Sequence, residues 1–388
     1  MLTSTRCAPV LLLLVACGAG ACSSEEPAQT SATGGPTSGS GGGTGTGGNG
    51  GGGPPFTGCE GTTEAHANFN AFWSGFDETY ALFDIRLPDG SWDDIGQEAC
   101  ATIGPDTAGD ALFDLLIGMA RNLDDGHVQL EAPDLGRDED ALVSIYPHED
   151  EVEQLEGNVE DNYLDGALTY AAEDEIAWGT IGTIGYVSIT SLDELSATGD
   201  EDDDRQAASE AMAAVMADLA GTSGMVIDVR ANGGGWDSVA LDIAALFEGD
   251  SALAWSKQRR NGPEHDDFSE WEDVLVAAAP GNAYTGDVVL LTSGSTFSAA
   301  ETFALAMRVR DRVTILGERS SGHFSDLYEG VLPNGWIYQL SGERYRAADM
   351  MIYETLGVPV DVAVPFDVQA LGTGQDVMLE AALAQLAP

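Results

Sequence analysis

The chain has 388 residues, of which 43% are hydrophobic, so it can bury one large core or two moderate ones. It carries 65 acidic and only 15 basic residues, giving a formal charge of −50. Such a surface repels nucleic acid and anionic lipid, which excludes both as partners bound by charge. The acidic run Asp202–Asp204 lacks the alternating ligands and turn glycine of a calcium loop, so we expect solvated surface there.

Residues 1–22 have the pattern of a lipoprotein export signal. A short head with Arg6 precedes an apolar run that is too short to span a membrane. Lipid attachment needs a small residue before a cysteine and an aliphatic residue three positions ahead of it. Cys17, in the sequence LVAC, fits this pattern better than Cys22, in AGAC, and Cys22 is kept as the alternative. A cleaved secretory peptide without lipid is the other interpretation.

Residues 23–58 are predicted to be a disordered tether. The stretch 38–55 reads SGSGGGTGTGGNGGGGPP and has no apolar side chains to bury. A lipid followed by such a tether would hold the folded part near a membrane, with no other membrane contact. The scarcity of lysine and the glycine tether suggest the envelope of a Gram-negative bacterium, on its periplasmic or outer-membrane face.

Two cysteines, Cys59 and Cys100, remain in the predicted folded part. In an exported protein they can pair as a disulfide at the start of the domain. No Cys/His cluster has the spacing of a zinc site, so we expect neither a metal nor another cofactor.

Helical spacing dominates residues 59–127, which we predict to be a small helical domain. Its first helix gathers large aromatic side chains on one face, where a core role is the simplest interpretation: Phe69, Phe72, Trp73, Phe76, Tyr80 and Phe83. Residues 128–180 form an acidic, weakly patterned connecting region.

Residues 181–388 are predicted to be an α/β core with crossover strand–helix–strand units. The runs TIGYVSI, GMVIDVR, DVVLLTS and RVTILGE read as strands, the last three largely buried on both faces, and the runs DSVALDIAALF and SAAETFALAMRVR read as helices. The alternating stretch 335–350 is predicted to be an antiparallel hairpin.

Ser298 is the strongest candidate for chemistry. It follows a strand-ending loop and opens a helix, where free backbone N–H groups and the helix dipole suit an oxyanion site. The alternative is a plain capping box, with Glu301 three residues later. The glycine turn at 232–235 lacks the spacing of a phosphate-binding loop and is weak evidence alone.

Four motifs together resemble the C-terminal processing (tail-specific) serine peptidases, in the branch related to the tricorn core protease and interphotoreceptor retinoid-binding protein. They are LDDGHVQL, GMVIDVRANGGG, GSTFSAAETFA and YETLGVPVDVAVP. The resemblance implies a small helical domain followed by a ClpP/crotonase-like core. Only about fifty residues separate HVQL from TIGYVSI, so we expect no PDZ domain.

The resemblance also implies the catalytic residues. In the bacterial processing proteases a lysine about 25 residues after the serine is the base, but here that place holds His323. The tricorn-like pattern instead matches His127 as base and Glu354 as the carboxylate that orients it. Asp124 and Asp125 beside His127 should hold its pKa near or above neutrality. His323 stays an alternative base, and Gly126 replaces a serine that supports the histidine in tricorn.

The mechanism implied is peptide hydrolysis through an acyl-enzyme, with the oxyanion held by N–H groups of Ala299 and of the turn containing Gly233 and Gly234. The partner would be a peptide or protein substrate. The retinoid-binding relative keeps a second function open, a non-catalytic ligand- or protein-binding lipoprotein on the same fold. The oligomeric state is not predicted.

Overall fold

A seven-stranded sheet is the centre of the computed structural model, which describes residues 56–88 and 90–387. The predicted export signal, Cys17, Cys22 and most of the tether lie outside these residues. In spatial order the strands are β14 (Val362–Ala363), β10 (Val313–Gly317), β9 (Asp287–Thr292), β6 (Gly224–Asp228), β5 (Ile184–Ile189), β4 (Ile176–Ile181) and β3 (Thr169–Ala171).

The strands from β14 to β5 run parallel, and β4 and β3 extend the sheet antiparallel. Every residue of β5 and β6 is buried, as the continuous apolar runs predict. The predicted α/β core with crossover units is therefore confirmed. The carboxyl ends of β6 and β9 lie side by side, and the glycine turn and the Ser298 loop both begin there.

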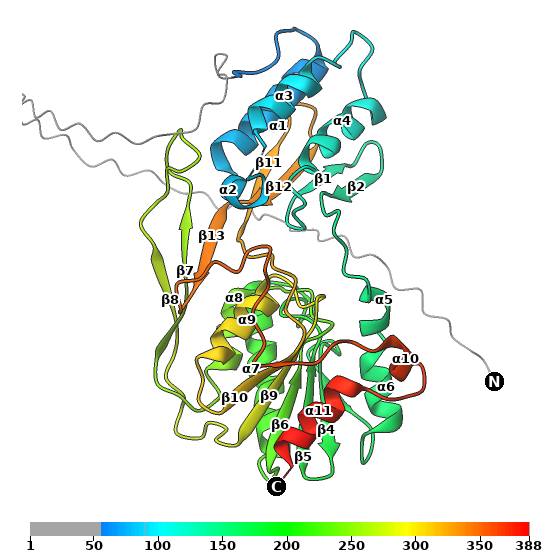
Figure 1. Cartoon of the computed structure of the whole chain (residues 1–388), viewed down its shortest axis with the longest axis vertical. Helices are drawn as coiled ribbons and strands as arrows, with labels where there is room; N and C mark the ends of the chain where they lie inside the picture. The colour runs from blue at the N-terminus through cyan, green and yellow to red at the C-terminus, as the bar shows by residue number, and fades with distance from the viewer. Residues whose placement is uncertain (1–55, 89, 388) are drawn as a thin grey trace, which may run out of the picture. The chain divides into compact units, whose positions relative to one another are not determined.

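Helices cover both faces of this sheet (Figure 1). One face packs against α7 (Glu201–Asp218), α8 (Asp237–Ala244) and α9 (Ala299–Arg308). The other packs against α6 (Leu155–Asn162) and α11 (Val377–Leu386). Two short helices, α5 (Glu149–Val152) and α10 (Val368–Leu371), lie in the connecting segments.

A second hydrophobic core belongs to the helical part of the chain. The helices α1 (Glu64–Thr79), α2 (Phe83–Arg86), α3 (Trp92–Cys100) and α4 (Asp110–Ala120) share it with a four-stranded sheet of order β11 (Leu327–Val331), β12 (Ile337–Ser341), β1 (Gln129–Ala132) and β2 (Arg137–Asp140). The six predicted aromatic residues are all buried in this core, as expected. Cys59 and Cys100 form a disulfide beside it.

The predicted hairpin at 335–350 is wrong. Strand β12 pairs with β11 and β1, whereas β13 (Glu343–Ala347) pairs with β7 (Ala252–Arg259), which in turn pairs with β8 (Glu272–Val276). The cause is burial in two different cores: Tyr338 and Leu340 pack in the helical part, while Tyr345 and Ala347 pack against the α/β core. Alternation alone does not tell a hairpin from two such strands.

The helical part and the α/β part therefore interleave along the sequence. Strands β11 and β12 lie within the range predicted as peptidase core, yet they complete the sheet under α1 and α4. One folded unit accounts for all the described residues, and the domain ranges expected from the sequence stay a prediction. In the described part of the chain, no helix has the length and apolarity needed to cross a bilayer.

Candidate active site

Ser298 occupies a tight turn between β9 and α9. Its backbone has φ 54° and ψ −123°, a conformation that side chains rarely adopt and that marks functional turns. Glu301, in the first turn of α9, accepts the Ser298 N–H at 3.2 Å through Oε2. The capping box expected as the alternative is therefore present. The Ser298 hydroxyl also lies 2.9 Å from His127 Nε2, a contact that capping does not explain.

His127 reaches this serine from the turn that follows α4. Asp125 Oδ1 accepts the His127 backbone N–H at 2.9 Å. Asp125 Oδ2 in turn accepts the hydroxyl groups of Tyr80 and Ser341, each at 2.8 Å. These buried hydrogen bonds fix the turn, so a residue 171 positions before Ser298 meets its hydroxyl at hydrogen-bonding distance.

The electrostatics of His127 differ from the prediction. Burial lowers the pKa of the imidazole to about 4, with Arg86 adding to the effect and Asp125 opposing it. The expected pKa near or above neutrality is therefore wrong. The reason is that Asp124 turns away, its carboxylate accepting the backbone N–H groups of Val143 and Ser144, while desolvation outweighs the attraction of Asp125. A neutral imidazole near pH 7 can accept the proton of Ser298.

Glu354 is buried near this pair but does not contact the imidazole. Its Oε2 accepts the Phe324 N–H at 2.8 Å, and its Oε1 accepts the Arg86 Nε–H at 2.6 Å. Among the hydrogen bonds of the described residues, none joins Glu354 to His127. The direct orienting contact expected from the resemblance is replaced by an ion pair with Arg86.

Arg86, at the end of α2, is the residue that sequence reasoning missed. Its side chain is 3% exposed and pairs with Glu354, and its Nε lies 3.6 Å from Asp125 Oδ2. It also donates to the carbonyl oxygens of Asp124 and Gly322. One guanidinium thus joins the His127 turn to the segments that carry His323 and Glu354. The only signal in the sequence is a lone arginine in the apolar run ALFDIRL.

The two turns at the sheet edge leave backbone donors free beside Ser298. Gly234 N–H donates to Asn232 Oδ1 at 2.8 Å, so Gly234 is not one of them. In the described residues, Gly233 N and Ala299 N have no intramolecular acceptor. Gly234 has φ 114°, and a Cβ there would lie 2.8 Å from Ser298 Cβ and 3.2 Å from Ala299 N. Glycine at this position keeps the space beside the hydroxyl open.

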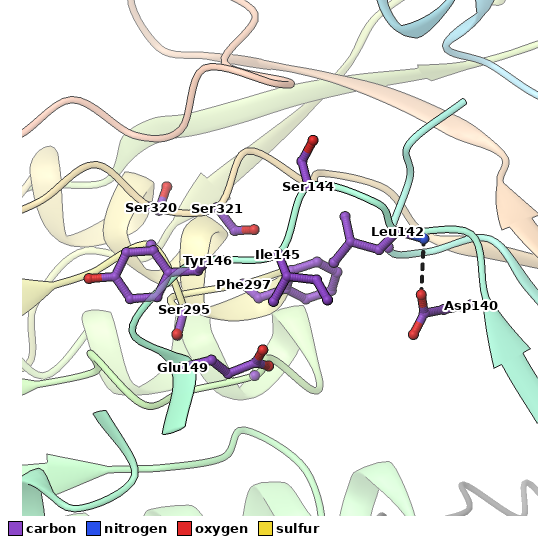
Figure 2. Close-up of a pocket in the computed structure, with 13 residues that line it drawn as sticks. Asp140, Leu142, Ser144, Ile145, Tyr146, Glu149, Ser295, Phe297, Ser320 and Ser321 are labelled. Atoms are coloured by element: carbon purple, nitrogen blue, oxygen red, sulfur yellow. Dashed lines mark hydrogen bonds between the residues drawn. The ribbon is translucent and has the colours of Figure 1, made fainter. Parts of the chain in front are cut away.

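A cavity of about 420 Å³ adjoins these turns. Its lining includes Gly126, which precedes His127, and Gly233, which precedes Gly234. It also includes Ser295 and Phe297, from the loop that leads into Ser298. Figure 2 shows its polar lining, with Ser295, Ser320, Ser321 and Glu149 around Phe297.

Comparison with known proteins identifies the family. The sequence model of Peptidase family S41 matches residues 183–364, which hold the glycine turn, Ser298 and Glu354. Residues 183–364 are a family S41 peptidase domain. The resemblance seen in the sequence is thereby confirmed at the level of this serine peptidase family, and His127 and Arg86 lie outside the matched range.

Individual relatives agree with the S41 assignment. The carboxyl-terminal-processing protease of Synechocystis sp. is 28% identical over 136 residues, which cover 35% of this chain and 27% of that protein. A crystal structure of a candidate peptidase from Parabacteroides merdae has a TM-score of 0.71 and 25% identity, and covers 84% of this chain and 98% of its own. Mature CPAF complexed with lactacystin has a TM-score of 0.60 at 10% identity, over 83% of this chain and 98% of its own, and shares the fold alone.

Two other basic side chains, His323 and Lys257, make no hydrogen bond to Ser298 in the described residues. His323 Nδ1 lies 2.8 Å from Ser321 Oγ, its ring centroid is 6.3 Å from that of His127, and no hydrogen bond in the described chain joins it to Ser298. Lys257 lies on β7 and pairs with Glu343 at 3.0 Å and with Asp326. The structure therefore brings together Ser298 and His127, but neither His323 nor Lys257.

Gly126, which stands where the tricorn-like pattern has a serine, has a packing explanation. A Cβ at Gly126 would lie 2.9 Å from Phe297 Cε2, so the Phe297 ring occupies the space that a side chain would need. His127 Nδ1 is buried without a hydrogen-bond partner in the described residues. No group of three or more His, Cys, Asp or Glu in those residues is arranged to hold a metal ion.

Proposed function

We propose that this chain is a serine endopeptidase whose nucleophile is Ser298 and whose general base is His127. The observation that carries the proposal is the 2.9 Å contact between Ser298 Oγ and His127 Nε2, within a family S41 peptidase fold. A buried neutral imidazole paired with a serine at a strained turn is the arrangement that activates a weak nucleophile.

In the first half of the reaction, Ser298 Oγ attacks the carbonyl carbon of a peptide bond as His127 Nε2 takes its proton. The resulting oxyanion accepts hydrogen bonds from Gly233 N–H and Ala299 N–H. Collapse of this intermediate breaks the C–N bond. The leaving amine takes the proton from His127, and an ester to Ser298 remains.

In the second half, His127 takes a proton from a water molecule as its oxygen attacks the ester carbonyl. The acid product leaves and the proton returns to Ser298 Oγ. Glu354 serves indirectly in this scheme: it holds Arg86, which lies 3.6 Å from the Asp125 carboxylate that accepts the His127 N–H.

The cellular setting is proposed from the sequence alone. We place the folded part outside the cytoplasm, tethered through residues 23–58 to a lipid on Cys17 or Cys22, because residues 1–22 have the composition of a lipoprotein signal. Metabolic labelling with a fatty-acid analogue, followed by mass spectrometry of the N-terminal peptide, distinguishes Cys17, Cys22 and a protein without lipid.

Fluorophosphonate labelling tests the catalytic proposal without a known substrate. We expect one adduct, on Ser298, that is lost in His127→Ala and kept in His323→Ala, with circular dichroism showing that both variants fold. Labelling that survives in His127→Ala but is lost in His323→Ala would move the base to His323. A folded protein without any adduct would contradict the proposal and favour a binding protein on a peptidase fold.

The pH dependence of kcat/KM should reveal the low pKa of His127. Since only the neutral imidazole accepts a proton, and burial lowers its pKa to about 4, activity should persist as the pH falls below 6.5 and decline toward pH 4. The measurement is kcat/KM from pH 3.5 to 8 on one peptide, with circular dichroism at each pH to exclude acid unfolding. An acidic limb centred at pH 6.5 or above would show that the imidazole is not desolvated in the active enzyme.

A further inference from the structure

The cavity beside Ser298 is placed to receive a substrate side chain. It is bordered by Gly126, which precedes the proposed base, and by Gly233, which offers an oxyanion donor. Ser295 and Phe297, from the loop that leads into Ser298, complete this side. A peptide whose carbonyl carbon lies at Ser298 Oγ therefore directs a neighbouring side chain into this cavity. This role for the cavity rests on the proposed peptidase function.

The opposite wall is the segment 140–149, which leads from β2 into α5. Asp124 Oδ1 accepts the N–H groups of Val143 and Ser144 at 2.6 and 2.7 Å, which ties the wall to the turn carrying His127. Farther along, the Tyr146 ring lies directly over Gly294, where a Cβ would come within 2.2 Å of the ring. The wall is thus held at both ends, so the cavity has a defined shape.

The charge of this cavity has one sign. Among the thirteen residues that line it, all of them described, Asp140 and Glu149 are the carboxylates, and there is no Lys, Arg or His. Asp140 Oδ1 already accepts the Leu142 N–H at 3.0 Å. Glu149 is exposed, and in the described chain its carboxylate has neither an ion-pair partner nor a hydrogen-bond partner. It is available to a ligand.

The hydroxyl oxygen of Ser295, another residue that lines this cavity, also lacks a hydrogen-bond partner in the described chain. Ser295 Oγ is buried and, within the described residues, makes no hydrogen bond. Figure 2 shows the Ser295 hydroxyl and the Glu149 side chain on the same side of Phe297. Because this oxygen is closed to solvent, the polar group that the cavity offers to a ligand is the Glu149 carboxylate. A carboxylate near an aromatic ring suits a ligand that has an apolar stem and a cationic end.

We infer that this cavity selects a lysine or arginine side chain beside the scissile bond. The methylene stem packs against Phe297, and the ammonium or guanidinium group pairs with Glu149. An acidic side chain, or a free C-terminal carboxylate, placed there meets two carboxylates and no cation. The net charge of −50 favours the approach of basic substrates in the same direction.

The test is the cleavage preference of the wild-type protein. Digestion of a reduced, alkylated protein mixture, with sites mapped by mass spectrometry, should place lysine or arginine next to the cleaved bond. Quenched peptides that differ only at that residue should then give a kcat/KM ratio of lysine to leucine of about ten, the effect of one charged hydrogen bond. Glutamate should be the poorest residue.

Variants of α5 assign the preference to its source. Glu149→Gln should reduce the lysine-to-leucine ratio to near one, and Glu149→Lys should favour glutamate. Asp150→Asn removes the same charge from the next residue of α5, which does not line the cavity, and should keep the wild-type ratio. The ratio compares two substrates on one preparation, so partial misfolding of a variant does not affect it.

Two results would overturn the inference while leaving the peptidase intact: cleavage without preference for basic residues, or a preference unchanged in Glu149→Gln. If Ser298 takes no fluorophosphonate and no peptide is cut, the proposed function itself fails, and the inference fails with it.

Discussion

Replacing Ser298 by alanine should lower kcat/KM for peptide hydrolysis by about 10⁴- to 10⁶-fold and lower the free energy of unfolding by only about 1 kcal/mol, the usual cost of losing a helix cap. Among the described residues, the Ser298 hydroxyl is the nucleophile within hydrogen-bonding distance of the proposed base, 2.9 Å from His127 Nε2. Ser298 is half-buried, and alanine fills the same turn without the hydroxyl. The loss should therefore be chemical rather than structural.

Coupling between the two residues is the sharper signature. If Ser298 and His127 act as one unit, His127→Ala should cost about as much as Ser298→Ala, and the double variant should be no slower than either single one. The measurement is kcat/KM of all three on one peptide, with Ser238→Ala, a serine at the start of α8, as the control. Losses that multiply in the double variant would mean that the two residues act independently.

The serine–histidine pair was predicted from the resemblance to the tail-specific peptidases, because both residues lie in local motifs that carry that resemblance. Ser298 precedes a helix with Glu301 in place, and His127 follows a helix in the run DDGHV. The sequence did not predict the buried side chains that surround this pair. Arg86 acts across separations of 38 to 268 residues, and no local pattern indicates such a partner. The low pKa of His127 arises from burial, which depends on the whole fold.

In the fold, too, features marked by a local sequence pattern were predicted, and features set by contacts distant in sequence were not. Strands such as β5 and β6 are recognisable because burial on both faces leaves a continuous apolar run. Strands β12 and β13 were predicted as a hairpin because the stretch 335–350 alternates between apolar and polar residues. Their partners, β1 and β7, are distant in sequence, and only packing against two separate cores decides the pairing.

Replacing Arg86 by methionine should lower the free energy of unfolding by about 3–5 kcal/mol, the typical cost of leaving buried charges without their partner. Glu354 and Asp125 are both buried, and Arg86 is the cation that pairs with Glu354 and lies nearest to Asp125 Oδ2. Urea denaturation at neutral pH measures the loss. Arg121→Met is the matched control, since Arg121 forms an exposed pair with Glu139 and should cost at most about 1 kcal/mol.

Two further readouts separate a positioning role of Arg86 from simple structural damage. Arg86→Met/Glu354→Leu should be more stable than Arg86→Met alone, because it also removes the unpaired carboxylate. In either variant the acidic limb of kcat/KM should move to higher pH. Burial lowers the pKa of His127 most, Asp125 raises it and Arg86 lowers it further, so without the guanidinium less opposes Asp125 and the imidazole protonates more readily. If the Arg86→Met protein is folded but less stable, and the acidic limb of its kcat/KM profile is unchanged, then Arg86 stabilises the fold but does not set the charge state of His127.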